Sequence, residues 1–176
     1  MLPAFETDRL ALRPRTMVDF EACLAMDRDP RVVQYIPGPW DDTEKHEAFL
    51  RERIQTDFGK GLGYWSIFSR DTESRFLGWV LLIPYDGIGP KVEIGWRLNR
   101  SAWGQGYGTE AARPFVSYAF DQIGLPEIVA DIDTRNVASH RIAEKIGMQH
   151  AGDMMYGAIP MKSYRLTRRN YRSSAL

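Results

Sequence analysis

The chain has 176 residues, of which 44% are apolar and 26% charged, proportions that are ordinary for a folded domain with a buried core. Lysine plus arginine and aspartate plus glutamate both number 23, so the formal net charge is zero and nothing global favours nucleic acid or an anionic membrane as a partner. Cys23 is the only cysteine, which excludes an internal disulfide and a thiolate-rich metal site. The three histidines have no ligand spacing, so we expect no metal.

The sequence shows no signal peptide and no membrane-spanning run, which predicts a cytoplasmic protein. Charged residues stand at positions 6, 8 and 9, where a signal peptide needs an apolar core. The longest apolar run, residues 79–83, is far too short to span a bilayer. We find no linker or repeat, and we therefore expect one domain over residues 1–176.

Hydrophobic periodicity and turn residues predict the order of the elements. In chain order we expect strands at 9–13, 64–69, 76–83, 91–98, 127–133, 148–156 and 161–167. We expect helices at 16–29, 31–35, from 42 or 43 to 58, at 111–120 and at 136–146, a turn at 71–74, and a basic tail after 168 that frays. Strands and helices mix without strict alternation, so the predicted fold class is α+β with a mostly antiparallel sheet.

A glycine-rich turn joins the strand at 91–98 to the helix that follows it. Glycines 104, 106 and 108 let the backbone turn sharply and let a ligand come close. The helix begins with unpaired N–H groups and a partial positive charge. Together these features predict a cradle for a phosphate or pyrophosphate, with a plain glycine-rich loop as the alternative. No Gly-Lys-Ser/Thr occurs in the chain, and Gly-x-Gly-x-Gly this late is not a Rossmann fingerprint, so two common nucleotide motifs are excluded or unlikely.

Three separated segments resemble one enzyme family. Residues 6–14 (Glu-Thr-Asp-Arg-Leu-Ala-Leu-Arg-Pro), followed by Asp19, resemble the opening of the ribosomal-protein N-terminal acetyltransferase-like branch of the GNAT superfamily. Residues 103–112 (Trp-Gly-Gln-Gly-Tyr-Gly-Thr-Glu-Ala-Ala) resemble its acetyl-CoA signature. Residues 136–139 and 144–148 resemble its second cofactor segment. The order and spacing of the three segments match over about residues 6–167.

This resemblance implies the GNAT fold and acetyl-CoA as co-substrate. The fold is a curved sheet of about seven strands, flanked by helices and split in a V between the fourth and fifth strands, here residues 91–98 and 127–133. Pantetheine would lie in the V against backbone groups of residues 96–98, and the pyrophosphate would meet the amides of the glycine turn. The cofactor-binding residues so implied are Trp96, Leu98, Trp103, Gly104, Gln105, Gly106, Tyr107, Gly108, Thr109, Asn136 and Ser139. Helix capping by Asn136 and packing by Tyr107 are the alternatives.

The reaction that the resemblance implies is direct attack of an amine on the acetyl thioester. A backbone N–H near Trp96 or Leu98 would hold the thioester oxygen. Glu93, on the strand just before the split, is the preferred base, and Asp131 is the second choice. A surface carboxylate is the alternative interpretation of Glu93. Many members of the superfamily use a tyrosine acid at the position of Ala143, so we consider Ser139 as its substitute.

The acceptor is expected to lie between the loop at 37–40, the helix after it and the final hairpin. Trp40, Tyr64, Trp65 and Tyr156 would line this region, unless Tyr64 or Trp65 belongs to the core. A protein N-terminal α-amine or a small-molecule amine both fit, with no nucleic acid and no membrane as partner. A homodimer is common in this branch. The alternative function is a non-catalytic acyl-CoA-binding or regulatory protein of the same fold, which the missing tyrosine keeps open.

Overall fold

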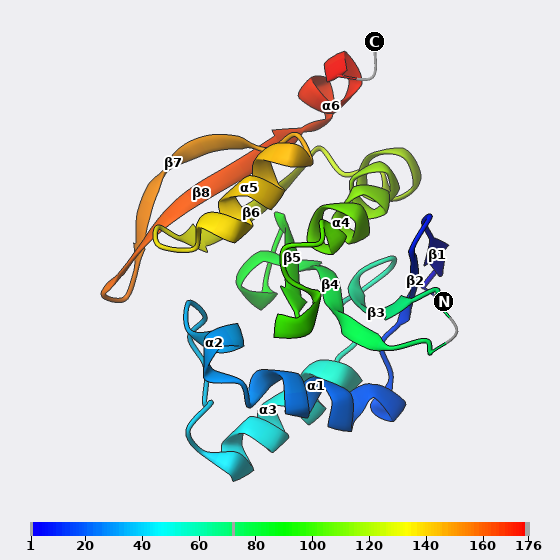
Figure 1. Cartoon of the computed structure of the whole chain (residues 1–176). Helices are drawn as coiled ribbons and strands as arrows, with labels where there is room; N and C mark the ends of the chain where they lie inside the picture. Colours follow the sequence, from blue (N-terminus) through cyan, green and yellow to red (C-terminus); the bar gives the residue numbers. More distant parts are fainter. Residues whose placement is uncertain (1, 72, 175–176) are drawn as a thin grey trace.

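A computed structural model describes residues 2–71 and 73–174, and one eight-stranded sheet runs through it (Figure 1). The strand order is β1-β2-β3-β4-β5-β6-β8-β7, and every neighbouring pair is antiparallel except β5 with β6. The strands are β1 (Phe5–Glu6), β2 (Leu10–Pro14), β3 (Gly63–Ser69), β4 (Phe76–Pro84), β5 (Val92–Leu98), β6 (Glu127–Asp133), β7 (Gln149–Tyr156) and β8 (Ile159–Thr167). The predicted α+β fold is confirmed, and the strand beyond the expected seven is the two-residue β1.

Helices cover both faces of the sheet (Figure 1). On one face lie α1 (Phe20–Asp27), α2 (Pro30–Val33) and α3 (Thr43–Gln55), and on the other lie α4 (Tyr107–Ser117) and α5 (Val137–Lys145). The remaining helical segments are η1 (Met17–Asp19), η2 (Tyr85–Gly87), η3 (Arg100–Ala102), the π-helical η4 (Tyr118–Ile123) and α6 (Arg168–Ser174). Across the two described ranges, no helix combines the length and the apolarity that a bilayer crossing needs.

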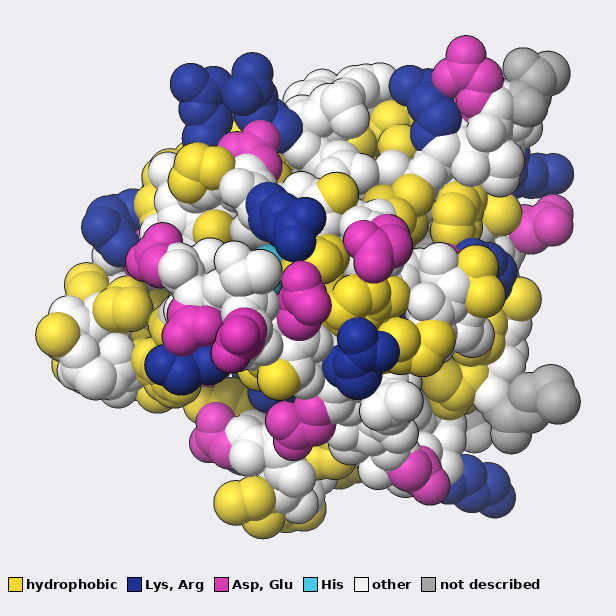
Figure 2. All heavy atoms as spheres, turned by 90° about the horizontal axis from the view of Figure 1, so that it is seen from below, with side chains coloured by type: hydrophobic (Ala, Val, Ile, Leu, Met, Phe, Trp, Pro, Cys, Tyr) yellow, Lys and Arg dark blue, Asp and Glu magenta, His cyan; other side chains and the backbone are white. Residues whose placement is uncertain are grey.

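The face that carries α1 and α3 mixes both signs of charge. In Figure 2, which looks onto these helices, Lys and Arg side chains alternate with Asp and Glu, and apolar side chains fill the spaces between them. No large area of a single sign forms on this face (Figure 2). The balance of charge in the sequence therefore also holds locally on the side where the acceptor was expected.

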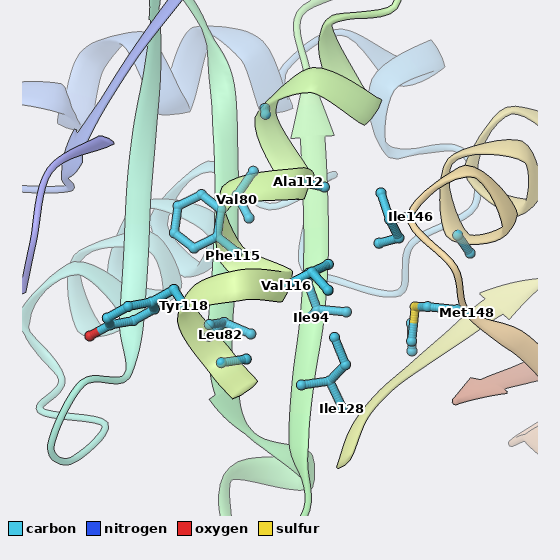
Figure 3. Close-up of a cluster of buried hydrophobic side chains, with 14 of the residues drawn as sticks. Val80, Leu82, Ile94, Ala112, Phe115, Val116, Tyr118, Ile128, Ile146 and Met148 are labelled. Atoms are coloured by element: carbon cyan, nitrogen blue, oxygen red, sulfur yellow. The ribbon is translucent and has the colours of Figure 1, made fainter. Parts of the chain in front are cut away.

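The apolar run of β4 serves two cores at once, because side chains alternate across a strand. Val80 and Leu82 point toward α4, where Phe115 and Val116 meet them together with Ile94 of β5 (Figure 3). The opposite residues of β4, Trp79, Leu81 and Ile83, pack against α1, α2 and α3 in a second cluster, which also holds the buried Cys23. The sheet is thus covered on both sides, and β4 is its centre.

The sheet opens between β5 and β6. The ladder between β4 and β5 has seven paired positions, and so does the ladder between β6 and β8. By contrast, β5 and β6 are paired only at Glu93 and Val129. The two strands therefore separate beyond Glu93, which gives the V-shaped split that the resemblance implied.

Several boundaries differ from the sequence expectation, and two of these differences have a clear local cause. Helix α4 begins at Tyr107 rather than Ala111, because Gly106 adopts a left-handed φ of +80° and serves as its N-cap. The tail from 168 forms α6 instead of fraying, because Tyr171 stacks on Phe120 with ring centroids 4.9 Å apart and its hydroxyl donates to Asp121 at 2.7 Å. The turn predicted at 71–74 includes Thr72, which lies outside the described residues, as do 175–176 of the tail.

Candidate active site

The three glycines of the turn before α4 meet two different requirements. Gly104 and Gly106 have φ values of +73° and +80°, which L-residues rarely adopt. A Cβ on Gly104 would meet nothing within 4 Å, and one on Gly106 would meet only Arg9 Nη2 at 3.6 Å, so open space faces this turn. A Cβ on Gly108 would instead lie 2.5 Å from Ile142 Cδ1. The first two glycines shape the turn, and the third lets α4 and α5 pack closely.

An N-terminal segment fastens this turn to the rest of the fold. The Arg9 Nη1 donates to the Gln105 carbonyl at 3.0 Å, and Arg9 Nε donates to Glu110 at 2.7 Å. The Thr7 hydroxyl donates to the other oxygen of Glu110 at 2.6 Å. The Arg9 guanidinium also lies 4.4 Å from the centre of the Tyr107 ring. Tyr107 therefore packs under Arg9, which agrees with its alternative interpretation.

The residues next to the turn bond to one another. The Trp103 indole donates to the Leu98 carbonyl at 3.0 Å, and the Gln105 side-chain amide donates to the Ser101 carbonyl at 2.8 Å. The Leu98 carbonyl therefore already accepts one hydrogen bond, because Trp103 folds back over the end of β5. Thr109 lies half-buried in the first turn of α4.

Asn136, Ser139 and Trp96 form a chain of hydrogen bonds across the split. Asn136 Oδ1 accepts from the Ser139 N–H at 3.1 Å and so caps α5. The Trp96 indole donates to the Ser139 hydroxyl oxygen at 3.2 Å. Since the hydroxyl oxygen is the acceptor in that bond, its proton remains available to another group. Ala143, where many family members carry tyrosine, is fully buried in the core.

A cavity of about 460 Å³ opens where β5 and β6 separate. Its walls come from the loop at 36–40, α3, the ends of β3 and β4, the split strands and the final hairpin. Trp40, Tyr64 and Tyr156 line it as expected, whereas Trp65 is fully buried and donates to the Pro3 carbonyl at 2.7 Å. The cavity is therefore aromatic and lies where the sequence placed the acceptor.

Glu93 lies in this cavity, at the position where β5 is paired with β6. In the described part of the chain, its carboxyl forms no hydrogen bond or ion pair. Burial raises the pKa of Glu93 to about 7, and the charge of Asp131 adds to the shift while Arg53 opposes it. A carboxylate with this pKa accepts protons near neutral pH, as a general base must.

Asp131 is placed differently from Glu93. One of its oxygens accepts the Tyr85 hydroxyl, and the other accepts the Ser163 hydroxyl at 2.6 Å. The bond to Asp131 raises the pKa of Tyr85 well above its ordinary value. Because both oxygens of Asp131 are engaged, it is less suited to be the base and acts on Glu93 through its charge.

Sequence reasoning missed several residues that line or support the site. Tyr85 and Asp86 lie in the short η2 turn after β4, and all four of Tyr85, Asp86, Arg15 and Arg53 line the cavity. Arg9 belongs to a segment that the resemblance covers, yet its contact with Glu110 is 101 residues away in sequence. Nothing in local spacing indicates such contacts.

The family comparison agrees with this geometry. A family model described as an acetyltransferase (GNAT) domain matches residues 9–149.

This chain belongs to the GNAT acetyltransferase family.

A curated relative of this GNAT chain is the FsC-acetyl coenzyme A-N(2)-transacetylase of Aspergillus fumigatus, which is 31% identical over 157 residues. The match covers 84% of this chain and 66% of the relative, so it spans just under two thirds of that protein. The name of this relative and the family model support an acetyl-CoA acyltransferase. They do not single out the ribosomal-protein branch.

Solved GNAT structures have the same fold. An acetyltransferase from Agrobacterium tumefaciens superimposes with a TM-score of 0.80 at 27% identity, covering 94% of this chain and 95% of that chain. The spermidine N-acetyltransferase of Vibrio cholerae, solved with CoA and spermine, has a TM-score of 0.76 at 16% identity, covering 94% and 99%. The second likeness shows the fold alone. Within residues 2–71 and 73–174 of this GNAT domain, no three His, Cys, Asp or Glu side chains form a metal-binding group.

Proposed function

We propose that this protein transfers the acetyl group of acetyl-CoA to a primary amine, with Glu93 as the general base. The observation that carries the proposal is the Glu93 carboxyl, which lies half-buried in the cavity at the split, and whose pKa is raised to about 7. An amine that enters the cavity would lose its proton to Glu93, directly or through one water. Membership of the GNAT family supports acetyl-CoA as the donor.

The glycine turn supports binding of the diphosphate of acetyl-CoA. Gly104 and Gly106 leave open space at the N-terminus of α4, where N–H groups and the helix dipole favour an anion. Trp96 and Asn136 line the split, where the pantetheine arm would lie along β5. Arg9 would hold the turn in place from below through the Gln105 carbonyl.

The bond changes assign a role to each residue. Acetyl-CoA supplies an acetyl thioester, and the N–C bond forms as the C–S bond breaks. A backbone N–H of β5, near Trp96, would hold the carbonyl oxygen as it gains charge. Ser139 would donate its hydroxyl proton to the leaving thiolate, because the Trp96 indole already binds its oxygen. Ser139 regains a proton from solvent, and Glu93 releases the proton it took from the amine.

The acceptor is a protein N-terminal α-amine or a small-molecule amine. An α-amino group has a pKa near 8 and is neutral about one time in ten at pH 7, so it asks little of the base. A lysine-type amine near pKa 10.4 is neutral far less often and depends more on Glu93. Kinship with the ribosomal-protein branch, a homodimer and a cytoplasmic location stay predictions from the sequence.

Thermal unfolding with acetyl-CoA, CoA and NAD tests the donor. A ligand at 100 times its Kd adds about 2.7 kcal/mol, which raises the Tm by roughly 5–10 °C for a chain of this size. We expect this shift with acetyl-CoA and CoA but not with NAD. Amine-dependent release of the CoA thiol then tests transfer. Binding without release from any amine would support a non-catalytic acyl-CoA-binding protein, and no shift at millimolar acetyl-CoA would refute the donor.

A further inference from the structure

Most charged side chains that line the cavity already have a partner of opposite charge or a pair of hydrogen bonds. Arg97 donates to the buried Asp27 at 2.8 Å, and Asp133 accepts from Arg135 at 2.7 Å. Asp131 accepts from two hydroxyl groups, as described above. Glu93 is explained by its proposed role as the base. Asp86 also lines the cavity, and its charge acts on Glu93. The two arginines that line the cavity, Arg15 and Arg53, remain.

Arg15 is a buried cation without a carboxylate. It is 8% exposed, and its guanidinium lies 3.7 Å from the centre of the Tyr64 ring. Its Nη2 donates only a long bond of 3.3 Å to the Arg53 carbonyl, and its Nε is buried without a hydrogen-bond partner. Within the described ranges Arg15 forms no ion pair, and burial lowers its pKa from the ordinary value. The charge of Asp27 acts on Arg15, but Asp27 is already paired with Arg97, so Arg15 lacks the direct ion pair that normally accompanies burial of a cation.

Arg53 lies beside Arg15 and is also unpaired in the described part of the chain. It comes from the last turn of α3, and its guanidinium lies 5.3 Å from the centre of the Phe49 ring. Its side chain lines the cavity and is partly exposed to it. Two guanidinium groups therefore line the same cavity, and among the described residues neither forms an ion pair, although the charge of Asp27 acts on Arg15 and that of Glu93 on Arg53.

The register of the sheet relates the backbone position of Arg15 to that of Glu93. The Arg15 N–H donates to the Tyr64 carbonyl, Tyr64 is paired with Leu81, and Leu81 is paired with Gly95. This row crosses three strand spacings of about 4.8 Å each. Glu93 lies two residues from Gly95 on β5. Arg15 and Glu93 thus enter the same aromatic cavity from strand positions three spacings apart, and the charge of Arg53 acts on Glu93 within it.

We propose that the acceptor amine carries an anionic group, a carboxylate or a phosphate, which binds Arg53 and Arg15 while its amine lies at Glu93. Guanidinium groups bind both anions through paired N–H donors. The anion would supply the ion pair that Arg15 lacks and orient the amine toward the base. Polyamines would be disfavoured, because their second ammonium would face the two arginines. This inference rests on the proposed transfer to amines and names the class of acceptor.

A matched series of amines tests the proposal. n-Butylamine, 4-aminobutanoate, 3-aminopropylphosphonate and 1,4-diaminobutane share a short chain and differ at the far end. L-phenylalanine and phenethylamine differ only by a carboxylate next to the amine. For each compound we would measure kcat/KM by thiol release and affinity for the CoA-loaded protein by calorimetry. In at least one series the anionic member should exceed its neutral match at least tenfold, and the diamine should be poorest.

Variants of Arg53 separate a binding role from a structural one. Arg53→Met keeps the apolar stem and should remove the preference for the anionic amine, lowering kcat/KM for that amine at least tenfold more than for its neutral match, because the loss of the Arg53 charge near Glu93 acts on both amines alike. Arg53→Lys should restore part of the preference, because it restores the charge without the planar fork. Arg51→Met is the matched control, since Arg51 is exposed on the same helix and does not line the cavity.

The outcomes distinguish the acceptor class from the proposed function. Equal affinities within both series, or equal losses for both members in Arg53→Met, would overturn the anionic acceptor while acetyl transfer stands. A carboxylate preference without a phosphonate preference would identify the anion as a carboxylate, and the reverse would identify it as a phosphate. If no amine releases thiol, the proposed transfer fails, and calorimetry alone still decides whether the arginines bind an anionic amine.

Discussion

Glu93 and Asp131 face the same cavity from β5 and β6, yet only Asp131 is held by hydrogen bonds. Tyr85 and Ser163 donate to both oxygens of Asp131, and the charge of Asp131 adds to burial in raising the pKa of Glu93 to about 7. One carboxylate is thus held by two hydrogen bonds, and the other is left to exchange a proton. Two carboxyl groups in different surroundings can in this way hold different roles.

Glu93→Gln should lower kcat by about 100- to 10,000-fold, which is the usual contribution of a general base. Its KM for acetyl-CoA should change little, because the glycine turn is remote from β5 residue 93. The wild-type kcat/KM should show an inflection near pH 7 that the variant lacks. Glu52→Gln, on the exposed side of α3, serves as the control. A variant with near wild-type kcat at saturating amine would exclude Glu93 as the base.

Glu93 should also make stability depend on pH. Its pKa is raised from 4.5 to about 7 in the folded chain, so between these values the unfolded chain has lost a proton that the folded chain keeps. Raising the pH through this window therefore destabilises the fold by up to ~3 kcal/mol, at about 1.4 kcal/mol per pKa unit. Glu93→Gln lacks this loss. Urea unfolding should find it more stable than wild type at pH 8, with a smaller difference at pH 5, and an equal difference at both values would contradict the burial of this group.

Gly108 should be coupled to Ile142. A Cβ at 108 would approach Ile142 Cδ1 to 2.5 Å, and overpacking of this kind costs about 1–3 kcal/mol. Gly108→Ala should therefore destabilise the wild-type chain, although alanine is intrinsically the better helix former by about 1 kcal/mol. In the I142V background the obstructing methyl is absent, and the same change should be neutral or stabilising. Denaturant unfolding of the four variants measures the coupling, and additive effects would refute it.

Arg9→Met should act on acetyl-CoA binding more than on stability. Arg9 is half-exposed, so its ion pair with Glu110 contributes at most about 1 kcal/mol to folding. Its bond to the Gln105 carbonyl, however, holds the turn between Gly104 and Gly106. We expect the KM for acetyl-CoA to rise severalfold at nearly constant kcat. Arg113→Met, on the exposed side of α4, is the control, and identical KM values for the two variants would show that the contact with Gln105 is dispensable.

Local patterns predicted the sheet well because each strand carries its own evidence. The alternation of Ile128, Ala130 and Ile132 with Val129, Asp131 and Asp133 predicted β6 within its observed bounds. The continuous apolar run of β4 marked a strand buried on both faces. Helix boundaries were harder to predict where the helix is capped by a backbone conformation and not by a side chain. Gly106 caps α4 through its left-handed φ, which residue type permits but does not require.

Tertiary contacts account for what the sequence could not predict. The basic tail was expected to fray because its sequence is polar and charged. The contact that orders it, Tyr171 on Phe120, joins residues 51 positions apart and is therefore invisible to local patterns. Three of the four aromatic residues predicted to surround the acceptor do line the cavity. The lack of an ion pair at Arg15 and Arg53, by contrast, depends on how distant segments pack around them. Glu93 was found by its place on the strand before the split, but its raised pKa follows from burial and from Asp131 on another strand.

The contact between Gly108 and Ile142 has an evolutionary consequence. A search pattern treats Gly-x-Gly-x-Gly as a single signature, yet here its last position is constrained by the Ile142 side chain on α5. Positions 108 and 142 should accordingly covary among relatives, with alanine or serine tolerated at the first where the second is small. Positions 104 and 106 should not covary with position 142. Glycine is favoured there by a left-handed backbone angle, which no substitution at a neighbouring residue changes.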